Sequence, residues 1–391
     1  QSKAKQSKAK QSKAKQSKAK QSKAKPILYF LINNYFKFLF QKYYLNLVKY
    51  FLTLITLDSL SRKIKSPCLV INKNFFQGVT DMKKLLTIFT ILLLFVASCG
   101  RDGEQSQGRK FGYTCMTMNN PFFGTISKSI QEELSKNGDA LIVLDPQLDQ
   151  AKQISQVEDM IAQGIELLFL NPVDWQGVKP ALDAAKQAGI PIVNFDADVY
   201  DKDLVDAIVI SDNYQAGFVC GEDLAKRMPN GGKLAIIEHA VAKSVLDRIN
   251  GFYDGLGSIS NKFKLVSRQD GLGQLEITLP IAENILQANP DVQVFFGGND
   301  PIALGIVAAL KAANKTGVLV YGVDGSPEIK ASIRNGEATG TGAQSPINIG
   351  KKSVEVAYKI LNGESFDKNI SVETALIDKN NVDNYGIDGW Q

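Results

Sequence analysis

The sequence predicts an α/β protein made of two doubly wound lobes with a cleft between them. From about residue 111 onward, short apolar runs of strand length alternate with amphipathic helical stretches. Strands separated by helices at this rhythm are typical of parallel sheets built from βαβ units. Two such series follow one another, and the roughly 290 residues from 99 onward suit two hydrophobic cores better than one.

The first series contains four strand-like runs with helical spacing between them. The runs lie at residues 111–118, 140–145, 166–172 and 190–196, and the helical patterns at 126–134, 154–161 and 178–188. A second series begins with a run at 207–211 and a helix at 216–228. Its further strand-like runs lie at residues 233–239, 262–268, 292–298 and 318–325.

Polar side chains follow many of these strands, and in open α/β sheets ligands bind beyond the carboxyl ends of the strands. The set combines carboxylates, amides, one guanidinium and two aromatic rings. Such groups suit a neutral polyhydroxyl ligand, because its hydroxyls need donors and acceptors and its C–H faces need flat apolar surfaces. Each residue alone could be a turn or cap residue. The candidates are Asn119, Asn120, Phe122, Phe123, Asp196, Arg248, Asn299, Asp300, Asp324 and Gln344.

Residues 82–98 have the parts of a secretory signal. Lys83 and Lys84 follow Met82, and an apolar run too short to span a bilayer comfortably leads to Val-Ala-Ser before Cys99. This ending resembles the lipobox of bacterial lipoproteins and predicts lipidation at Cys99, with residues 99–109 as a tether. The alternative is an ordinary internal apolar helix.

The segment before Met82 is predicted to be non-native upstream translation without a fold. Residues 1–25 are five copies of QSKAK, and residues 26–81 are rich in Phe, Tyr, Leu, Ile, Asn and Lys without a sustained period. An alternative is a lysine-rich tail followed by a membrane helix around residues 30–57, but its polar interruptions disfavour a spanning helix.

Charge and cysteine content also point to export. Residues 1–98 hold 19 of the 45 basic residues and 2 of the 40 acidic ones, so the remainder has 26 basic and 38 acidic residues and a net formal charge of −12. An acidic body predicts no nucleic-acid partner. Beyond Cys99 only Cys115 and Cys220 remain, and we interpret them as two separate buried thiols rather than a disulfide.

The ordered motifs resemble the ribose-binding family of periplasmic sugar-binding proteins over residues 110–365. They include TMNNPFFGTI, AGIPIVNFDAD, GGNDPIALGIVAAL, YGVDGSPE and AQSPINIGKKSVEVA. The resemblance implies a type I binding protein with two Rossmann-like lobes and three crossings, near Ser211, Gln344 and Val372. The lobes would be 110–211 with 344–371, and 212–343 with 372–391. The implied ligand contacts are Asn120, Phe122, Phe123, Asp196, Arg248, Asn299, Asp324 and Gln344.

The chain departs from the ribose-binding pattern at three places. Ala197 stands where the family has an arginine, Val323 replaces an aromatic residue, and the aromatic expected within residues 271–274 is missing. These changes favour a different sugar or a polyol. Trp175 could supply a replacement face, or could serve in packing. His239 ends a strand near the cleft, and we interpret it as a non-ligand residue.

We therefore expect a lipid-anchored extracytoplasmic receptor that delivers a sugar or polyol to an ABC permease and its ATPase. A receptor that serves only chemotaxis or signalling is the alternative. An enzyme would need an activated nucleophile, a metal cluster or a phosphate loop, and no such motif is found. A sugar-responsive regulator would begin with a DNA-binding segment instead of a signal. We expect a monomer with no cofactor and no metal.

Overall fold

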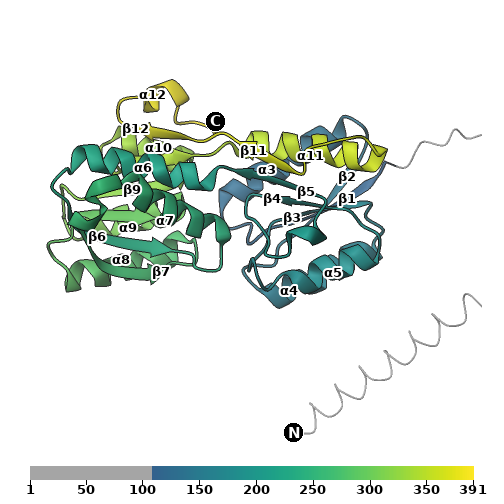
Figure 1. The fold of residues 1–391 in the computed structure, drawn as a ribbon, viewed down its shortest axis with the longest axis horizontal. Helices are drawn as coiled ribbons and strands as arrows, with labels where there is room; N and C mark the ends of the chain where they lie inside the picture. Colours follow the sequence, from purple (N-terminus) through teal and green to yellow (C-terminus); the bar gives the residue numbers. More distant parts are fainter. Residues whose placement is uncertain (1–107) are drawn as a thin grey trace, which may run out of the picture. The chain divides into compact units, whose positions relative to one another are not determined.

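The computed structural model describes residues 108–391, which form two α/β lobes (Figure 1). Each lobe is built on a six-stranded sheet with interleaved helices. The predicted fold class is therefore confirmed. The proposed signal, the lipidation site Cys99, most of the tether and the segment before Met82 all lie outside the described residues.

The first sheet has the strand order β11-β5-β4-β3-β1-β2, and every neighbouring pair is parallel. Its strands are β1 (Lys110–Thr114), β2 (Ala140–Leu144), β3 (Leu167–Leu170), β4 (Ile192–Phe195), β5 (Ala207–Ser211) and β11 (Asn369–Val372). Its helices are α3 (Pro121–Ser135), α4 (Gln150–Ala162), α5 (Lys179–Gln187) and α11 (Pro346–Asn362), with a 3₁₀ turn at Lys202–Leu204.

The second sheet has the equivalent order β12-β10-β9-β8-β6-β7, but its edge strand β12 runs antiparallel to β10. Its strands are β6 (Gly232–Glu238), β7 (Phe263–Asp270), β8 (Val294–Gly297), β9 (Leu319–Asp324), β10 (Gly340–Ala343) and β12 (Ala375–Asp378). Its helices are α6 (Asn213–Arg227), α7 (Lys243–Gly255), α8 (Leu275–Ala288), α9 (Asp300–Ala312), α10 (Pro327–Arg334) and α12 (Val382–Tyr385), with a 3₁₀ turn at Gly257–Lys262.

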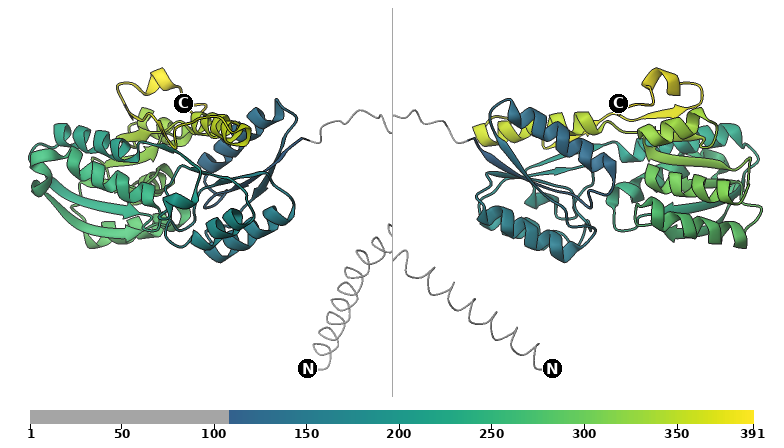
Figure 2. Two further views of the ribbon diagram at one scale, coloured as in Figure 1. Left: turned by 45° about the vertical axis from the view of Figure 1, so that its right-hand side comes forward. Right: turned by 180° about the vertical axis from the view of Figure 1, so that it is seen from behind.

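Within residues 108–391 the chain passes between the lobes three times (Figures 1 and 2). The passages lie between β5 and α6, between β10 and α11, and between β11 and β12. Helix α11 returns to pack on α3, and α6 packs on α7. Strand β5 therefore belongs to the first sheet, and assigning it to the second series from the hydrophobic rhythm was wrong. An apolar strand pattern identifies a buried strand without showing which sheet it joins.

Both faces of each sheet are covered, and this explains the continuous apolar runs in the central strands. In β3, Leu167 and Phe169 join one core cluster, whereas Leu168 and Leu170 join another. Side chains alternate between the faces of a strand, so a sheet buried on both faces needs an apolar residue at nearly every position.

The helices α6 and α7 approach closely because glycines face the contact. A Cβ atom added at Gly217 would lie 1.8 Å from the backbone oxygen of Arg248, and one at Gly251 would lie 2.0 Å from the backbone oxygen of Tyr214. A larger residue at either position would push α7 away. This close packing fixes the part of α7 that carries Arg248.

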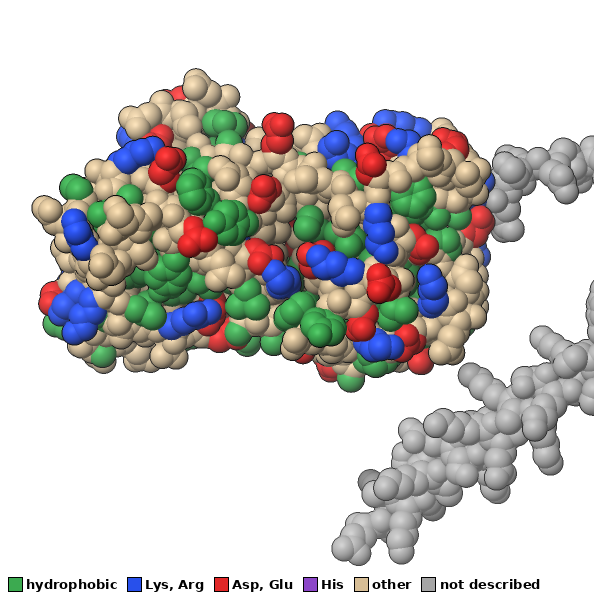
Figure 3. Space-filling view, in the orientation of Figure 1, with side chains coloured by type: hydrophobic (Ala, Val, Ile, Leu, Met, Phe, Trp, Pro, Cys, Tyr) green, Lys and Arg blue, Asp and Glu red, His purple; other side chains and the backbone are tan. Residues whose placement is uncertain are grey.

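The cysteines, the apolar character of the helices and the surface charges can be compared with the expectations from the sequence. Cys115 and Cys220 are both free and buried, which confirms two separate thiols. Among residues 108–391, no helix combines the length and the apolar character needed to cross a membrane. On the face shown in Figure 3, acidic and basic side chains are interspersed over both lobes.

Candidate ligand-binding site

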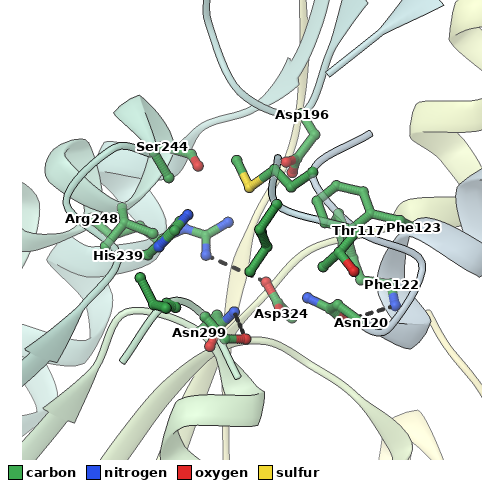
Figure 4. Close-up of a pocket in the computed structure, with 16 residues that line it drawn as sticks. Thr117, Asn120, Phe122, Phe123, Asp196, His239, Ser244, Arg248, Asn299 and Asp324 are labelled. Atoms are coloured by element: carbon green, nitrogen blue, oxygen red, sulfur yellow. Dashed lines mark hydrogen bonds and ion pairs between the residues drawn. The ribbon is translucent and has the colours of Figure 1, made fainter. Parts of the chain in front are cut away.

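A cavity lies where the carboxyl ends of the two sheets face each other (Figure 4). It encloses about 450 Å³ of space, its open mouth included. Seven of the nine predicted ligand residues line it, and they come from both lobes. They are Asn120, Phe122, Phe123, Asp196, Arg248, Asn299 and Asp324.

The start of α3 presents two aromatic rings to the cavity. Asn120 is the N-cap of this helix, and its side-chain oxygen accepts a hydrogen bond from the backbone N–H of Phe122 at 3.0 Å. Phe122 and Phe123 follow in the first turn and are almost fully buried, with their rings edge-to-face at 5.6 Å. The cap fixes where the helix begins and thereby where the rings stand.

The first lobe contributes one carboxylate, Asp196, directly after β4. Its Oδ2 accepts a hydrogen bond from the side-chain amide of Asn171 at 3.0 Å, while its buried Oδ1 has no partner within the described part of the chain. Burial raises the pKa of Asp196 to about 6, although nearby Arg248 and the Asn171 hydrogen bond oppose the shift. The unpartnered oxygen is an acceptor ready for a ligand hydroxyl.

The second lobe contributes an ion pair between Arg248 of α7 and Asp324 at the end of β9. Nη1 of Arg248 lies 3.4 Å from Oδ1 of Asp324, and both side chains are almost fully buried. The guanidinium also donates to Oδ1 of Asn213 and to the backbone oxygen of Gly298, both at 2.8 Å. These bonds hold its planar group in one orientation, as a donor to ligand oxygens must be held.

A second buried acid, Asp300, stands behind Asp324. Its carboxylate accepts hydrogen bonds from the backbone N–H of Ser326 and from the hydroxyl of Thr341, both at 2.7 Å. Burial raises the pKa of Asp300, and the nearby charge of Asp324 raises it further. Burial likewise raises the pKa of Asp324, and Arg248 opposes that shift only in part. The Arg248 guanidinium thus lies near two carboxyl groups, those of Asp324 and Asp196.

Asn299 closes the site from the start of α9. Its Oδ1 caps the helix by accepting a hydrogen bond from the backbone N–H of Ile302 at 3.0 Å, and its Nδ2 donates to the backbone oxygen of Gly273 at 3.1 Å. Asn299 therefore ties the loop after β7 to the cavity wall.

Two predicted residues, Gln344 and Trp175, are not among those lining the cavity. Gln344 is buried beside it and donates from Nε2 to Oδ1 of Asp324 at 2.8 Å. Trp175 packs edge-to-face on Tyr200 at 5.5 Å, and its backbone N–H donates to the backbone oxygen of Val241 in the other lobe at 3.3 Å. The packing alternative thus describes the Trp175 side chain.

The cavity also contains residues that the sequence reasoning missed. They are Met116, Thr117, Leu148, Ala242, Ser244, Val245, Leu272 and Gly273. Most follow the carboxyl end of β1, β2, β6 or β7, so the strand-end rule could have found them.

His239, which we interpreted as a non-ligand residue, also lines the cavity. It is buried, and neither ring nitrogen has a hydrogen-bond partner among the described residues; Nδ1 lies 3.6 Å from Oδ1 of Asp270. Burying an imidazole without hydrogen-bond partners destabilises the folded protein. A ligand hydroxyl that bonded to a ring nitrogen would offset this loss.

Backbone strain concentrates around the cavity. Six non-glycine residues within 108–391 have positive φ, and four of them line the site: Leu148, Asp196, Leu272 and Asp324. Asp324, with φ of 144°, lies far from the common regions. Such strain persists only where the surrounding structure imposes it, which is typical of functional sites.

Comparisons with known proteins agree with this geometry. The model of the periplasmic binding protein domain matches residues 111–365. The chain belongs to the periplasmic binding protein family. The predicted resemblance to ribose-binding proteins is confirmed. The chain is 34% identical over 306 residues to the ribose import binding protein of Bacillus subtilis (strain 168), covering 75% of this chain and 99% of the relative.

Solved structures that are similar to this chain include solute-binding proteins of ABC transporters. One is an ABC transporter solute-binding protein from Mycobacterium smegmatis with bound glycerol, 31% identical with a TM-score of 0.68, covering 71% of this chain and 96% of that one. Another, from Bacillus halodurans C-125, has bound myo-inositol and is 25% identical with a TM-score of 0.66, covering 71% and 98%. This periplasmic binding protein is thus of the sugar-binding, ABC-transporter type and is not an enzyme.

Proposed function

We propose that the protein is a lipid-anchored receptor that captures a sugar or polyol between its lobes and delivers it to an ABC importer. The observation that carries the proposal is the meeting, in one cavity, of Asp196 and two phenylalanine rings from the first lobe with the Arg248–Asp324 pair from the second. Carboxylates and a guanidinium bind hydroxyls, and rings bind C–H faces.

The ligand we propose is a hydroxyl-rich molecule other than ribose. The buried Ala197 stands where the ribose-binding pattern has an arginine, so one charged donor is lost. Leu272 and Gly273 line the cavity within the stretch where the ribose-binding pattern has an aromatic residue, and the missing ring favours a less planar ligand than a furanose. Relatives that bind glycerol and myo-inositol, besides those named for ribose, support this range.

Calorimetry with the chain from Cys99 onward should test the ligand class directly. A panel of pentoses, hexoses, pentitols and inositols is expected to include at least one tight ligand, with ribose not the tightest. Native mass spectrometry of the purified protein would reveal ligand retained from the cell. Ribose as the tightest ligand contradicts the selectivity argument, and binding of no member of the panel contradicts the receptor function.

We propose that the anchor is formed at Cys99, which lies outside the described residues. The basic and apolar segment before it and the exported nature of the family support processing there. One acyl chain binds membranes only marginally, so stable anchoring needs two or more. Cys99→Ala should leave the protein unlipidated or unprocessed. Detection of QSKAK peptides in cellular protein would contradict a start at Met82.

A receptor serving chemotaxis or signalling is the second candidate function. It uses the same cavity and differs only in its partner. Co-purification with a permease and its ATPase, and loss of ligand uptake on deletion, are expected for the importer. Intact uptake after deletion favours the signalling role.

A further inference from the structure

A second cavity adjoins the first at the side of α8, α9 and α10. It encloses about 720 Å³ of space, open solvent included, against about 450 Å³ for the first. The two cavities share Asn120, Gly273 and Asp324 in their walls. A ligand seated in the first cavity can therefore extend into the second between these residues without a change of fold.

The outer wall of the second cavity is the indole of Trp390, which the end of the chain holds in place. Lys330 donates to the backbone oxygen of Gly389 at 2.7 Å, and Ser345 donates to the backbone oxygen of Gln391 at 2.6 Å. The side chain of Gln391 also donates to the backbone oxygen of Asp324 at 3.1 Å. The residues on both sides of Trp390 are thus tied to the second lobe and to the β10–α11 passage.

The Trp390 ring also reaches the aromatic pair of the first cavity. It lies edge-to-face on Phe122 at 5.6 Å and 68°, and Trp390 itself is only half-buried. Because neighbours on both sides immobilise it, this aromatic surface is preformed and loses little entropy when a ligand stacks on it.

The rest of the second cavity combines apolar and acceptor groups. Leu275 and Leu304 extend the apolar surface, and Glu276 and Glu328 are exposed in the first turns of α8 and α10. Neither glutamate has an ion-pair partner within residues 108–391. An aromatic face flanked by uncommitted carboxylates is the combination that binds a sugar ring, through its C–H face and its hydroxyls.

We propose that the second cavity is a subsite for a second glycosyl unit, so that the protein accepts a disaccharide or glycoside whose first unit occupies the cleft. The proposal rests on the proposed sugar-binding function. The glycosidic linkage passes between Asn120 and Asp324, and the second ring stacks on Trp390.

Calorimetry with paired ligands tests this subsite. The probes are glucose and galactose with maltose, cellobiose, lactose and melibiose, together with the tightest monosaccharide of the panel and its glycosides. At least one disaccharide or glycoside is expected to bind about tenfold more tightly than its monosaccharide. Trp390→Ala should remove most of that difference. Tyr385→Ala, which removes an exposed aromatic residue of the same C-terminal segment outside both cavities, should leave it unchanged.

Because Trp390 contacts Phe122, its removal could also weaken monosaccharide binding, so a second variant is needed. Glu328 is exposed and does not line the first cavity, so Glu328→Gln serves as this second variant. The amide oxygen of glutamine replaces a charged acceptor with a neutral one, so disaccharide affinity should fall about three- to tenfold, with monosaccharide affinity unchanged. Monosaccharide binding without any gain from a second unit overturns the subsite alone. Binding of neither class overturns the receptor function and the subsite together.

Discussion

The sheets of the two lobes have equivalent strand orders, but the lobes contribute different side chains to the cleft. Strands β4 and β9 occupy equivalent places, and each is followed or ended by a cleft carboxylate with positive φ, Asp196 and Asp324. Both acids accept a hydrogen bond from an amide, Asp196 from Asn171 and Asp324 from Gln344. Only Asp324 forms an ion pair with Arg248, which influences Asp196 through space. Equivalent topology thus places the acids, whereas the neighbouring side chains determine their electrostatics.

The same contrast holds for the edge strands. Strand β11 lies parallel to β5, whereas β12 lies antiparallel to β10. Only two residues separate the end of β11 at Val372 from the start of β12 at Ala375. The chain therefore continues from one sheet into the other without room to reverse, and the second sheet receives its edge strand in the opposite direction.

Removal of the second lobe's cation should have the largest effect. Arg248→Met leaves Asp324 buried without its partner, and breaking a buried pair costs about 3–5 kcal/mol of unfolding free energy. Arg334→Met, which breaks an exposed pair with Asp383 in the same lobe, should cost no more than about 1 kcal/mol. Urea denaturation of both variants measures the difference, and similar losses would contradict the role given to the buried pair.

The two carboxylates should differ when each is replaced in turn. Asp324→Asn removes the ion-pair partner of Arg248, whereas Asp196→Asn removes a carboxylate that lies near this guanidinium without pairing with it. Loss of a charged hydrogen bond to ligand costs about 1.5–3 kcal/mol, or roughly ten- to a hundredfold in affinity. We expect calorimetry to show a loss of ligand affinity near the upper end of this range for Asp324→Asn. An equal or larger loss of ligand affinity with Asp196→Asn would contradict the expected difference between the two lobes.

The first lobe's acid, Asp196, should contribute to the pH dependence of stability, alongside Asp300 and Asp324, whose pKa values are also raised by burial. Because folding raises the pKa of Asp196 from 3.8 to about 6, the folded protein retains a proton in this range that the unfolded chain has lost. Without ligand, its contribution to stability, on the order of 3 kcal/mol, should be lost as pH rises from about 4 to 6.

Ligand affinity should change in the opposite direction over the same range. A sugar hydroxyl donates to the charged carboxylate, so affinity should rise as Asp196 ionises. Thermal melts and calorimetry between pH 4 and 7 measure the two trends, and Asp196→Asn should reduce the slope of both, with Asp300 and Asp324 accounting for the remainder. Parallel trends, or an unchanged slope in the variant, would show that another group controls the titration.

The smallest expected effect concerns the contacts between the lobes at the mouth of the cleft. Nδ2 of Asn119 donates to Oε1 of Gln274 at 3.3 Å across the two lobes, in an exposed position. Asn119→Ala should lower ligand affinity about two- to fivefold, because an exposed hydrogen bond contributes about 0.5–1 kcal/mol. Gln163→Ala, exposed and remote from the cleft, is the matched control.

Ligand-induced closure provides an independent check on these contacts. A ligand held by both lobes binds the closed state more tightly and shifts the population toward it. Small-angle scattering should therefore show a more compact molecule at saturating ligand, with a smaller change for Asn119→Ala. No change with a verified ligand would contradict closure by the two lobes.

The sequence alone determined the fold class and seven of the sixteen residues that line the cavity. Residues such as Asp196, Asn299 and Asp324 were found because they follow buried strands, and parallel strands bring their carboxyl ends to one edge. Both features are local in the sequence. The run of apolar residues identifies the strand, and the polar residue that follows marks the carboxyl end of that strand.

Only the tertiary structure decided the exposure of His239 to the cavity, the packing of Trp175 on Tyr200 and the place of Trp390. Each depends on segments far apart in the chain. Trp390, for example, meets Phe122 although 268 positions separate them, and the bonds of Lys330 and Ser345 hold it there. The free energy of such contacts comes from packing between elements, which no local pattern of residues contains.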